Sequence, residues 1–131
     1  MDPKKLVKIA LEVREKAYAR YSGFRVGAAL LTKSGRVFTG VNVENASYGL
    51  TVCAERVAVF KAISEGEREF VAIAIASDSS EKTVPCGACR QVLYEFCEDL
   101  DVIMADREGN YEIVKLRDLF PRGFKLGGEE H

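Results

Sequence analysis

No apolar run in the 131-residue sequence approaches the roughly 18 residues that a membrane-spanning helix needs. Basic residues are no more numerous than acidic ones, 19 Lys and Arg against 20 Asp and Glu, and they form no cluster. A polynucleotide partner would require a basic stripe to neutralise its phosphates. These absences argue against a membrane protein and give no support to nucleic acid binding.

A signal peptide is also missing from the first residues. The sequence from Met1 to Lys5 leads directly into an amphipathic helix pattern, without the apolar stretch and small-residue cleavage site of a secreted protein. We therefore expect a cytoplasmic protein, in which the four cysteines serve a metal or catalysis more often than disulfides. The only histidine is the terminal His131, which is not a candidate ligand.

The length and the order of apolar patterns predict one domain over residues 1–131, with a Gly-rich tail after about residue 125 whose order the sequence leaves open. Helices are expected over residues 4–20, 53–64, 87–98 and 116–120, and strands over residues 26–31, 36–43, 71–76, 102–105 and 111–114. The helix at 53–64 is apolar on almost every side, so we expect it to be central and buried. The fold class is α/β, a three-layer α/β/α arrangement around a mixed five-stranded sheet.

Three cysteines stand at the predicted starts of two helices. Cys86 and Cys89 follow Pro85 and share one face of the first turn, and Cys53 opens the helix at 53–64. Helix N-termini lower thiol pKa values toward the thiolate that a metal requires. Three thiolates leave the fourth tetrahedral position of a zinc ion open, which is typical of a catalytic site.

Charge balance at such a site points to neighbouring arginines. A zinc ion with three thiolates carries a net charge of −1, which opposes ionisation of a bound water. Arg56 lies three residues after Cys53 on the same helical face and is placed to donate hydrogen bonds to sulfur, and Arg90 is a second candidate.

Glu55 is the candidate general acid and base. In a regular helix it would not face the same way as Cys53, two residues earlier, so both serve one metal only if Cys53 sits at the irregular entry to the helix. From there the carboxylate would take a proton from zinc-activated water and deliver it to a substrate.

A closed structural zinc site would need a fourth ligand, and Cys97 is the only remaining cysteine. It lies eight residues beyond Cys89, about 12 Å along a helix, which is too far to join the same ion. We interpret Cys97 as a core residue and favour the open, catalytic site.

These residues resemble the zinc-dependent cytidine deaminases in their small homotetrameric form. The resemblance covers most of the chain in the family's order. It runs through residues 21–30 (YSGFRVGAAL), 40–49 (GVNVENASYG), 53–56 (CAER) and 85–91 (PCGACRQ).

The resemblance implies a role for each matching position. Cys53, Cys86 and Cys89 would hold Zn²⁺, Glu55 would shuttle protons, and Arg56 would relieve the negative charge. For substrate binding, the resemblance implies that Phe24 would stack near the base and that Asn42 and Glu44 would hold ribose hydroxyls. Ala54 is a further implied substrate-binding position. Three more residues match positions at pockets shared between subunits: Ala46, Tyr48 and Phe124.

The implied reaction is hydrolytic deamination of cytidine, and of 2′-deoxycytidine, in pyrimidine salvage. Zinc-activated water would attack C4 of the pyrimidine while Glu55 protonates N3 and then the leaving amine. Glu44 suits a plain nucleoside, whereas a blasticidin-S-like deaminase is the alternative within the same chemistry.

Three further interpretations stay open at the level of the sequence. Cys86 and Cys89 also fit a thiol redox motif, although this leaves Cys53 and Glu55 unexplained. A binding module without turnover would have no use for Glu55. Asn42 and Glu44 are also common turn formers, and Phe24 and Phe124 are ordinary core aromatics.

Overall fold

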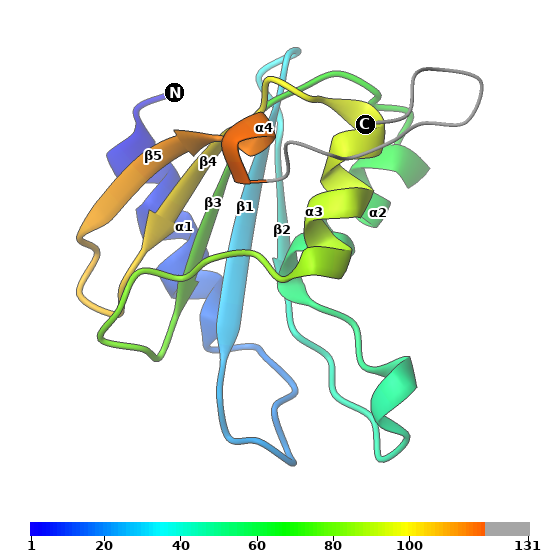
Figure 1. Ribbon diagram of the computed structural model, residues 1–131, viewed down its shortest axis with the longest axis vertical. Helices are drawn as coiled ribbons and strands as arrows, with labels where there is room; N and C mark the ends of the chain where they lie inside the picture. Colours follow the sequence, from blue (N-terminus) through cyan, green and yellow to red (C-terminus); the bar gives the residue numbers. More distant parts are fainter. Residues whose placement is uncertain (120–131) are drawn as a thin grey trace.

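The computed structural model describes residues 1–119, and the tail and Phe124 lie outside the described residues (Figure 1). Its strands are β1 (Val26–Thr32), β2 (Val37–Val41), β3 (Phe70–Ser77), β4 (Asp101–Ala105) and β5 (Tyr111–Lys115). Its helices are α1 (Pro3–Arg14), α2 (Ala54–Ser64), α3 (Gly87–Phe96), α4 (Leu116–Leu119) and a 3₁₀ turn at Tyr48–Leu50. None of these helices is long and apolar enough to span a membrane.

The five strands form one mixed sheet in the order β2-β1-β3-β4-β5. Only β3 and β4 run parallel, and the other neighbours pair antiparallel. The β1–β2 hairpin turns at Gly35, whose φ of 91° lies in the left-handed region that glycine adopts without strain. The predicted mixed five-stranded sheet is therefore confirmed.

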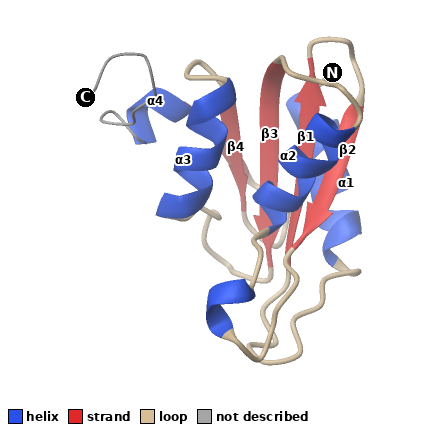
Figure 2. Cartoon of the chain, turned by 90° about the vertical axis from the view of Figure 1, so that its right-hand side faces the viewer, coloured by secondary structure: helices blue, strands red, loops and turns tan. Residues whose placement is uncertain are grey.

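Helices cover both faces of this sheet, as predicted (Figure 2). Along β3, Ile73 and Ile75 point into the core beneath α2 and α3, whereas Ala72 and Ala74 face α1. Both faces of β3 are buried, which explains its continuous apolar sequence. The result is a three-layer α/β/α arrangement.

Two glycines let helices approach the sheet closely. A Cβ atom on Gly27 would lie 2.1 Å from the carbonyl oxygen of Ala10 in α1. A Cβ on Gly40 would lie 2.2 Å from the carbonyl oxygen of Ala54, the first residue of α2. Gly40 therefore fixes how closely the start of α2, next to Cys53, packs on β2.

The predicted extension of the first helix to Arg20 is wrong, because α1 ends at Arg14. Beyond that point Tyr18 donates its backbone N–H to the carbonyl of Asn42 at 3.0 Å and accepts from the N–H of Glu44 at 2.9 Å. Long-range backbone pairing has replaced the helical pairing that the spacing of Val13 and Ala17 suggested.

The expectation that α2 is central and buried is correct for one of its faces and wrong for the other. Ala58, Val59 and Ala62 pack fully on the sheet, but Phe60 is 51% exposed. The sheet covers only one side of α2, which leaves an apolar strip facing outward on this chain.

Candidate active site

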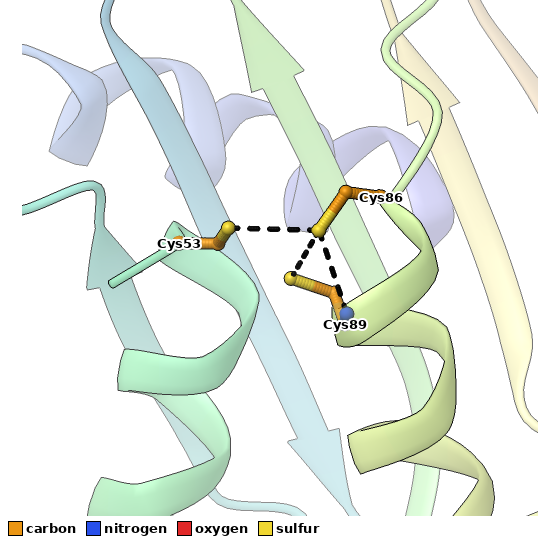
Figure 3. Close-up of side chains that lie close together, drawn as sticks. All are labelled: Cys53, Cys86 and Cys89. Atoms are coloured by element: carbon orange, nitrogen blue, oxygen red, sulfur yellow. Dashed lines mark hydrogen bonds between the residues drawn. The ribbon is translucent and has the colours of Figure 1, made fainter. Parts of the chain in front are cut away.

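Three cysteine side chains converge where α2 and α3 begin (Figure 3). Cys53 and Cys86 are the N-cap residues of these helices, with extended backbone at ψ 155° and 167°. The Sγ atom of Cys86 lies 3.6 Å from that of Cys53 and 3.2 Å from that of Cys89. The N-cap position of Cys53 meets the condition under which it shares a site with Glu55.

The spacing of the sulfur atoms fits a zinc ion. All three Sγ atoms lie within 4.8 Å of one another. A tetrahedral ion with 2.3 Å bonds to sulfur would separate its ligands by about 3.8 Å. In residues 1–119 the metal-ligating group contains these three cysteines alone, since Cys97 packs against the core and its thiol donates to the carbonyl of Phe70. One position of a tetrahedral ion would therefore be free.

Two of the three thiols have shifted pKa values. Hydrogen bonds from Cys89 and Arg56 lower the pKa of the Cys53 thiol to about 5, despite its partial burial. The pKa of Cys89 is raised, because its thiol is hydrogen-bonded to Cys53 and buried, with the charge of Glu55 nearby. Ionisation of Cys53 is favoured and ionisation of Cys89 is opposed, and a divalent cation among the sulfur atoms would stabilise both thiolates.

Arg56 is the arginine that reaches the cluster. Its Nη2 lies 3.6 Å from the sulfur of Cys53 and donates to the carbonyl of Thr51 at 3.3 Å. The hydrogen bond to Cys53 raises the pKa of the guanidinium further. Arg90, the second candidate, instead donates to the carbonyls of Pro85 and Leu119, at 2.9 and 3.0 Å.

Glu55 lies in the first turn of α2 beside Cys53 and is only 4% exposed. Burial raises the pKa of its carboxyl to about 7, and the charge of Cys53 adds to the shift. A carboxyl group with this pKa can both hold and release a proton near neutral pH.

A hollow of about 330 Å³ lies between the loop before β1 and the loop that joins β2 to α2. It is lined by Tyr21, Ser22, Glu44, Asn45, Tyr48 and Thr51. Thr51 links it to the metal cluster, because its carbonyl accepts the hydrogen bond from Arg56. The lining includes two of the predicted substrate-binding residues, Glu44 and Tyr48.

Glu44 is held in this hollow by the loop before β1. Its Oε1 accepts from the backbone N–H groups of Tyr21 at 2.9 Å and Ser22 at 3.0 Å, and its Oε2 accepts from the Ser22 hydroxyl. Hydrogen bonds from Ser22 lower the pKa of Glu44, so the carboxylate is ionised at neutral pH.

Asn42 lies behind this loop and is 9% exposed. Its Oδ1 accepts from the N–H of Val26 and its Nδ2 donates to the carbonyl of Phe24, both at 2.9 Å. The Phe24 side chain is 43% exposed at the surface of the loop. The side chain of Asn42 therefore orders the backbone that carries Phe24, and neither residue lines the hollow.

The other predicted positions lie at varied depths. Ala54 is fully buried at the start of α2, whereas Ala46 is exposed and Tyr48 is 81% exposed. Ser22 and Thr51 were not predicted to take part. Nothing local to Ser22 signals its contact with Glu44, 22 residues away, and the only available clue was its place in a turn-forming Tyr-Ser-Gly sequence.

Comparisons with known proteins agree with this geometry. A family model of the cytidine and deoxycytidylate deaminase zinc-binding region matches residues 1–105. The cytidine deaminase of Halalkalibacterium halodurans is 51% identical over 125 residues, which are 95% of each chain. That of Sporosarcina psychrophila is 45% identical over 125 residues, 95% of this chain and 92% of its own.

Solved structures match the fold as closely. The crystal structure of cytidine deaminase from Burkholderia pseudomallei has a TM-score of 0.92 and 48% identity, covering 95% of this chain and 100% of its own. That from Mycobacterium tuberculosis has a TM-score of 0.85 and 40% identity, covering 96% and 99%. With the family's zinc-binding region matched and three cysteines grouped for one ion, zinc is the cofactor of this site. The chain belongs to the cytidine deaminase family.

Proposed function

We propose that this protein converts cytidine and water to uridine and ammonia, and converts 2′-deoxycytidine in the same way, within pyrimidine salvage. The observation that carries the proposal is the buried carboxyl of Glu55 beside three converging cysteines. A metal site serving structure alone has no use for an acid in that place. The relatives at 51% and 45% identity are named cytidine deaminases.

Cys53, Cys86 and Cys89 would hold zinc, which would supply a Lewis acid that makes water nucleophilic near neutral pH. Glu55 would accept one proton from the water that attacks C4 and donate it to N3, and would then transfer the remaining proton of that water to the amine, which leaves C4 as ammonia. Arg56 donates to the sulfur of Cys53 and so offsets the excess negative charge of three thiolates.

Substrate recognition falls to the hollow and its rim. The ionised Glu44 carboxylate accepts hydrogen bonds from ribose hydroxyls, and one N–H of the Asn42 amide remains beyond the bond to Phe24. The exposed ring of Phe24 offers a flat apolar surface for the pyrimidine. Ala54, which directly follows Cys53 at the start of α2, is the remaining substrate-binding position that we propose.

We infer that the active unit is a homotetramer with pockets shared between subunits. The outer face of α2 forms an apolar groove of about 470 Å³ with Val43 and Val52, lined further by Val57, Phe60, Lys61 and Ser64. Tyr48 and Leu50 project from the neighbouring loop, 81% and 66% exposed. A contiguous apolar surface of this kind is covered in symmetric assemblies. The loop residues Ala46 and Tyr48 would then reach a neighbouring pocket, and we propose the same role for Phe124, which lies outside the described residues.

Phe60→Glu tests the assembly. Light scattering after size exclusion should give a tetramer for the wild type and a smaller species for the variant. The matched surface change Phe24→Glu, outside the groove, should leave the mass unchanged. A monomeric wild type would contradict the inference.

Thiol ligands keep their metal best in a reducing compartment, which is why we place the protein in the cytoplasm.

The reaction is tested by following the absorbance of cytidine, 2′-deoxycytidine, adenosine and blasticidin S with the zinc-loaded protein. We expect turnover of the two cytosine nucleosides and none of adenosine. Preferential turnover of blasticidin S would assign the antibiotic as substrate instead. A redox-active disulfide between Cys86 and Cys89 in metal-free active protein would overturn the hydrolytic mechanism altogether.

A further inference from the structure

The peptide group that joins Phe24 to Arg25 forms hydrogen bonds with two side chains, one at its carbonyl and one at its N–H. Its carbonyl accepts from Nδ2 of Asn42 at 2.9 Å, and its N–H donates to Oδ2 of Asp78 at 2.9 Å. On the other side of Phe24, the N–H donates to the Ser22 hydroxyl at 3.0 Å. Side chains thus hold both peptide planes that flank Phe24, and with them the direction in which its side chain leaves the backbone.

Asp78 makes the densest set of these contacts. It directly follows β3, and its own N–H donates to the carbonyl of Arg25 at 3.1 Å, which continues the β1–β3 ladder by one residue. Its two carboxylate oxygens also accept from Nε and Nη2 of Arg25, each at 3.1 Å. Such a forked, charge-assisted arrangement fixes both distance and orientation.

A second arginine steadies Asp78 from behind. The side chain of Arg14, at the end of α1, is 14% exposed, and its Nε lies 3.6 Å from Oδ1 of Asp78. Its Nη1 donates to the carbonyl of Ser77 at 2.8 Å. The carboxylate of Asp78 is itself only 24% exposed, so this pairing is shielded from solvent more than an ordinary surface ion pair.

From these contacts we infer that Asp78 is a positioning residue for substrate binding, which acts by holding the Phe24 ring where the pyrimidine stacks. The inference rests on the proposed function of Phe24. Asp78 would not touch the substrate, and it lies on a different element from Glu55 and the cysteines. Its loss should therefore weaken nucleoside binding and leave the chemical step almost unchanged.

Asp78→Ala and Asp78→Asn test this inference with cytidine as substrate. The alanine variant loses every side-chain contact, and we expect its KM to rise about tenfold with kcat within about threefold of the wild type. The asparagine variant keeps one acceptor for the Arg25 N–H, so its KM should rise less. The inhibition constant of uridine, which reports binding without chemistry, should rise in parallel.

Two controls separate positioning from general damage. Glu15→Gln removes the exposed ion pairs to both arginines that contact Asp78, Arg25 and Arg14, but leaves the bonds of Asp78 to the backbone in place, and should change neither KM nor kcat. In a Phe24→Ala background, Asp78→Ala should have no further effect on KM, because the ring that it positions is gone.

The outcomes that would overturn the inference are distinct. An unchanged KM in both Asp78 variants, a fall in kcat alone, or additive effects with Phe24→Ala would each refute the positioning role while cytidine turnover by the wild type still stands. If Asp78→Ala does not fold, the asparagine variant and its cycle with Phe24→Ala decide. A wild type that does not turn over cytidine would refute the proposed function and this inference together.

Discussion

The metal cluster and the hollow lined by Glu44 are held in place by different kinds of structure. The cluster lies at two helix starts, with Cys53 and Cys86 as N-caps and Glu55 buried in the first turn of α2. The hollow is built from exposed loops tied together by side chains such as Glu44, which binds residues 22 or 23 positions away. The residues that we propose for the chemistry are thus placed by local helix geometry, and those that we propose for substrate recognition are placed by contacts between distant segments.

The largest expected effect is at the cluster. Glu55→Gln preserves size and burial but removes the carboxyl that carries the proton, so kcat should fall by about 10²–10⁴. Zinc should stay bound, since Glu55 is not a ligand. The measurement is cytidine turnover alongside zinc content, and retained turnover in zinc-loaded protein would refute the proton shuttle.

Arg56→Gln should act on the metal itself. The variant loses the charged donor to the sulfur of Cys53, and we expect zinc affinity to fall by about 10–100-fold in a competition with a chelator. Arg90→Gln is the matched control, since Arg90 bonds to backbone carbonyls and not to sulfur. An equal loss of zinc in both variants would remove the special role of Arg56.

Two glycine substitutions compare the face of the sheet that packs against α1 with the face that packs against α2. Gly40→Ala and Gly27→Ala each force a Cβ onto helix backbone, and each should lower the free energy of unfolding in urea by about 1–3 kcal/mol or more. Only Gly40→Ala displaces the start of α2, so only this variant should also lose zinc affinity. An equal loss of zinc affinity in Gly27→Ala would contradict a specific effect of Gly40 on the metal site.

The smallest expected effect is in the hollow. Glu44→Gln leaves the site without its ionised acceptor, and KM for cytidine should rise about tenfold with little change in kcat. Glu65→Gln, at an exposed carboxylate that pairs with Arg36 on another surface, should leave both constants unchanged. A fall in kcat alone for Glu44→Gln would show that Glu44 acts on the chemistry and not on binding.

The same division decides what could be predicted from the sequence. Cys86 and Cys89 are three residues apart after a proline, and that spacing alone places both thiols at one helix start. The open fourth position followed from the distance to Cys97, which packs against the core as predicted.

Contacts between distant segments could not be predicted in this way. Asp78 meets Arg25 across 53 residues, and no local pattern announces that pairing. Tyr18 is not in the helix that the sequence predicts, because its backbone pairs with Asn42 and Glu44, and these partners are close to it only in the folded chain. Tertiary pairing decided these positions, and local propensity did not.

The catalytic zinc site is tested most directly by measuring the zinc content of purified Cys89→Ser and Cys97→Ser proteins beside the wild type. The wild type and Cys97→Ser should each carry about one zinc per chain and turn over cytidine, whereas Cys89→Ser should lose the metal and the activity together. Stoichiometric zinc and full turnover in Cys89→Ser, or a metal-free active wild type, would contradict a catalytic zinc site at Cys53, Cys86 and Cys89.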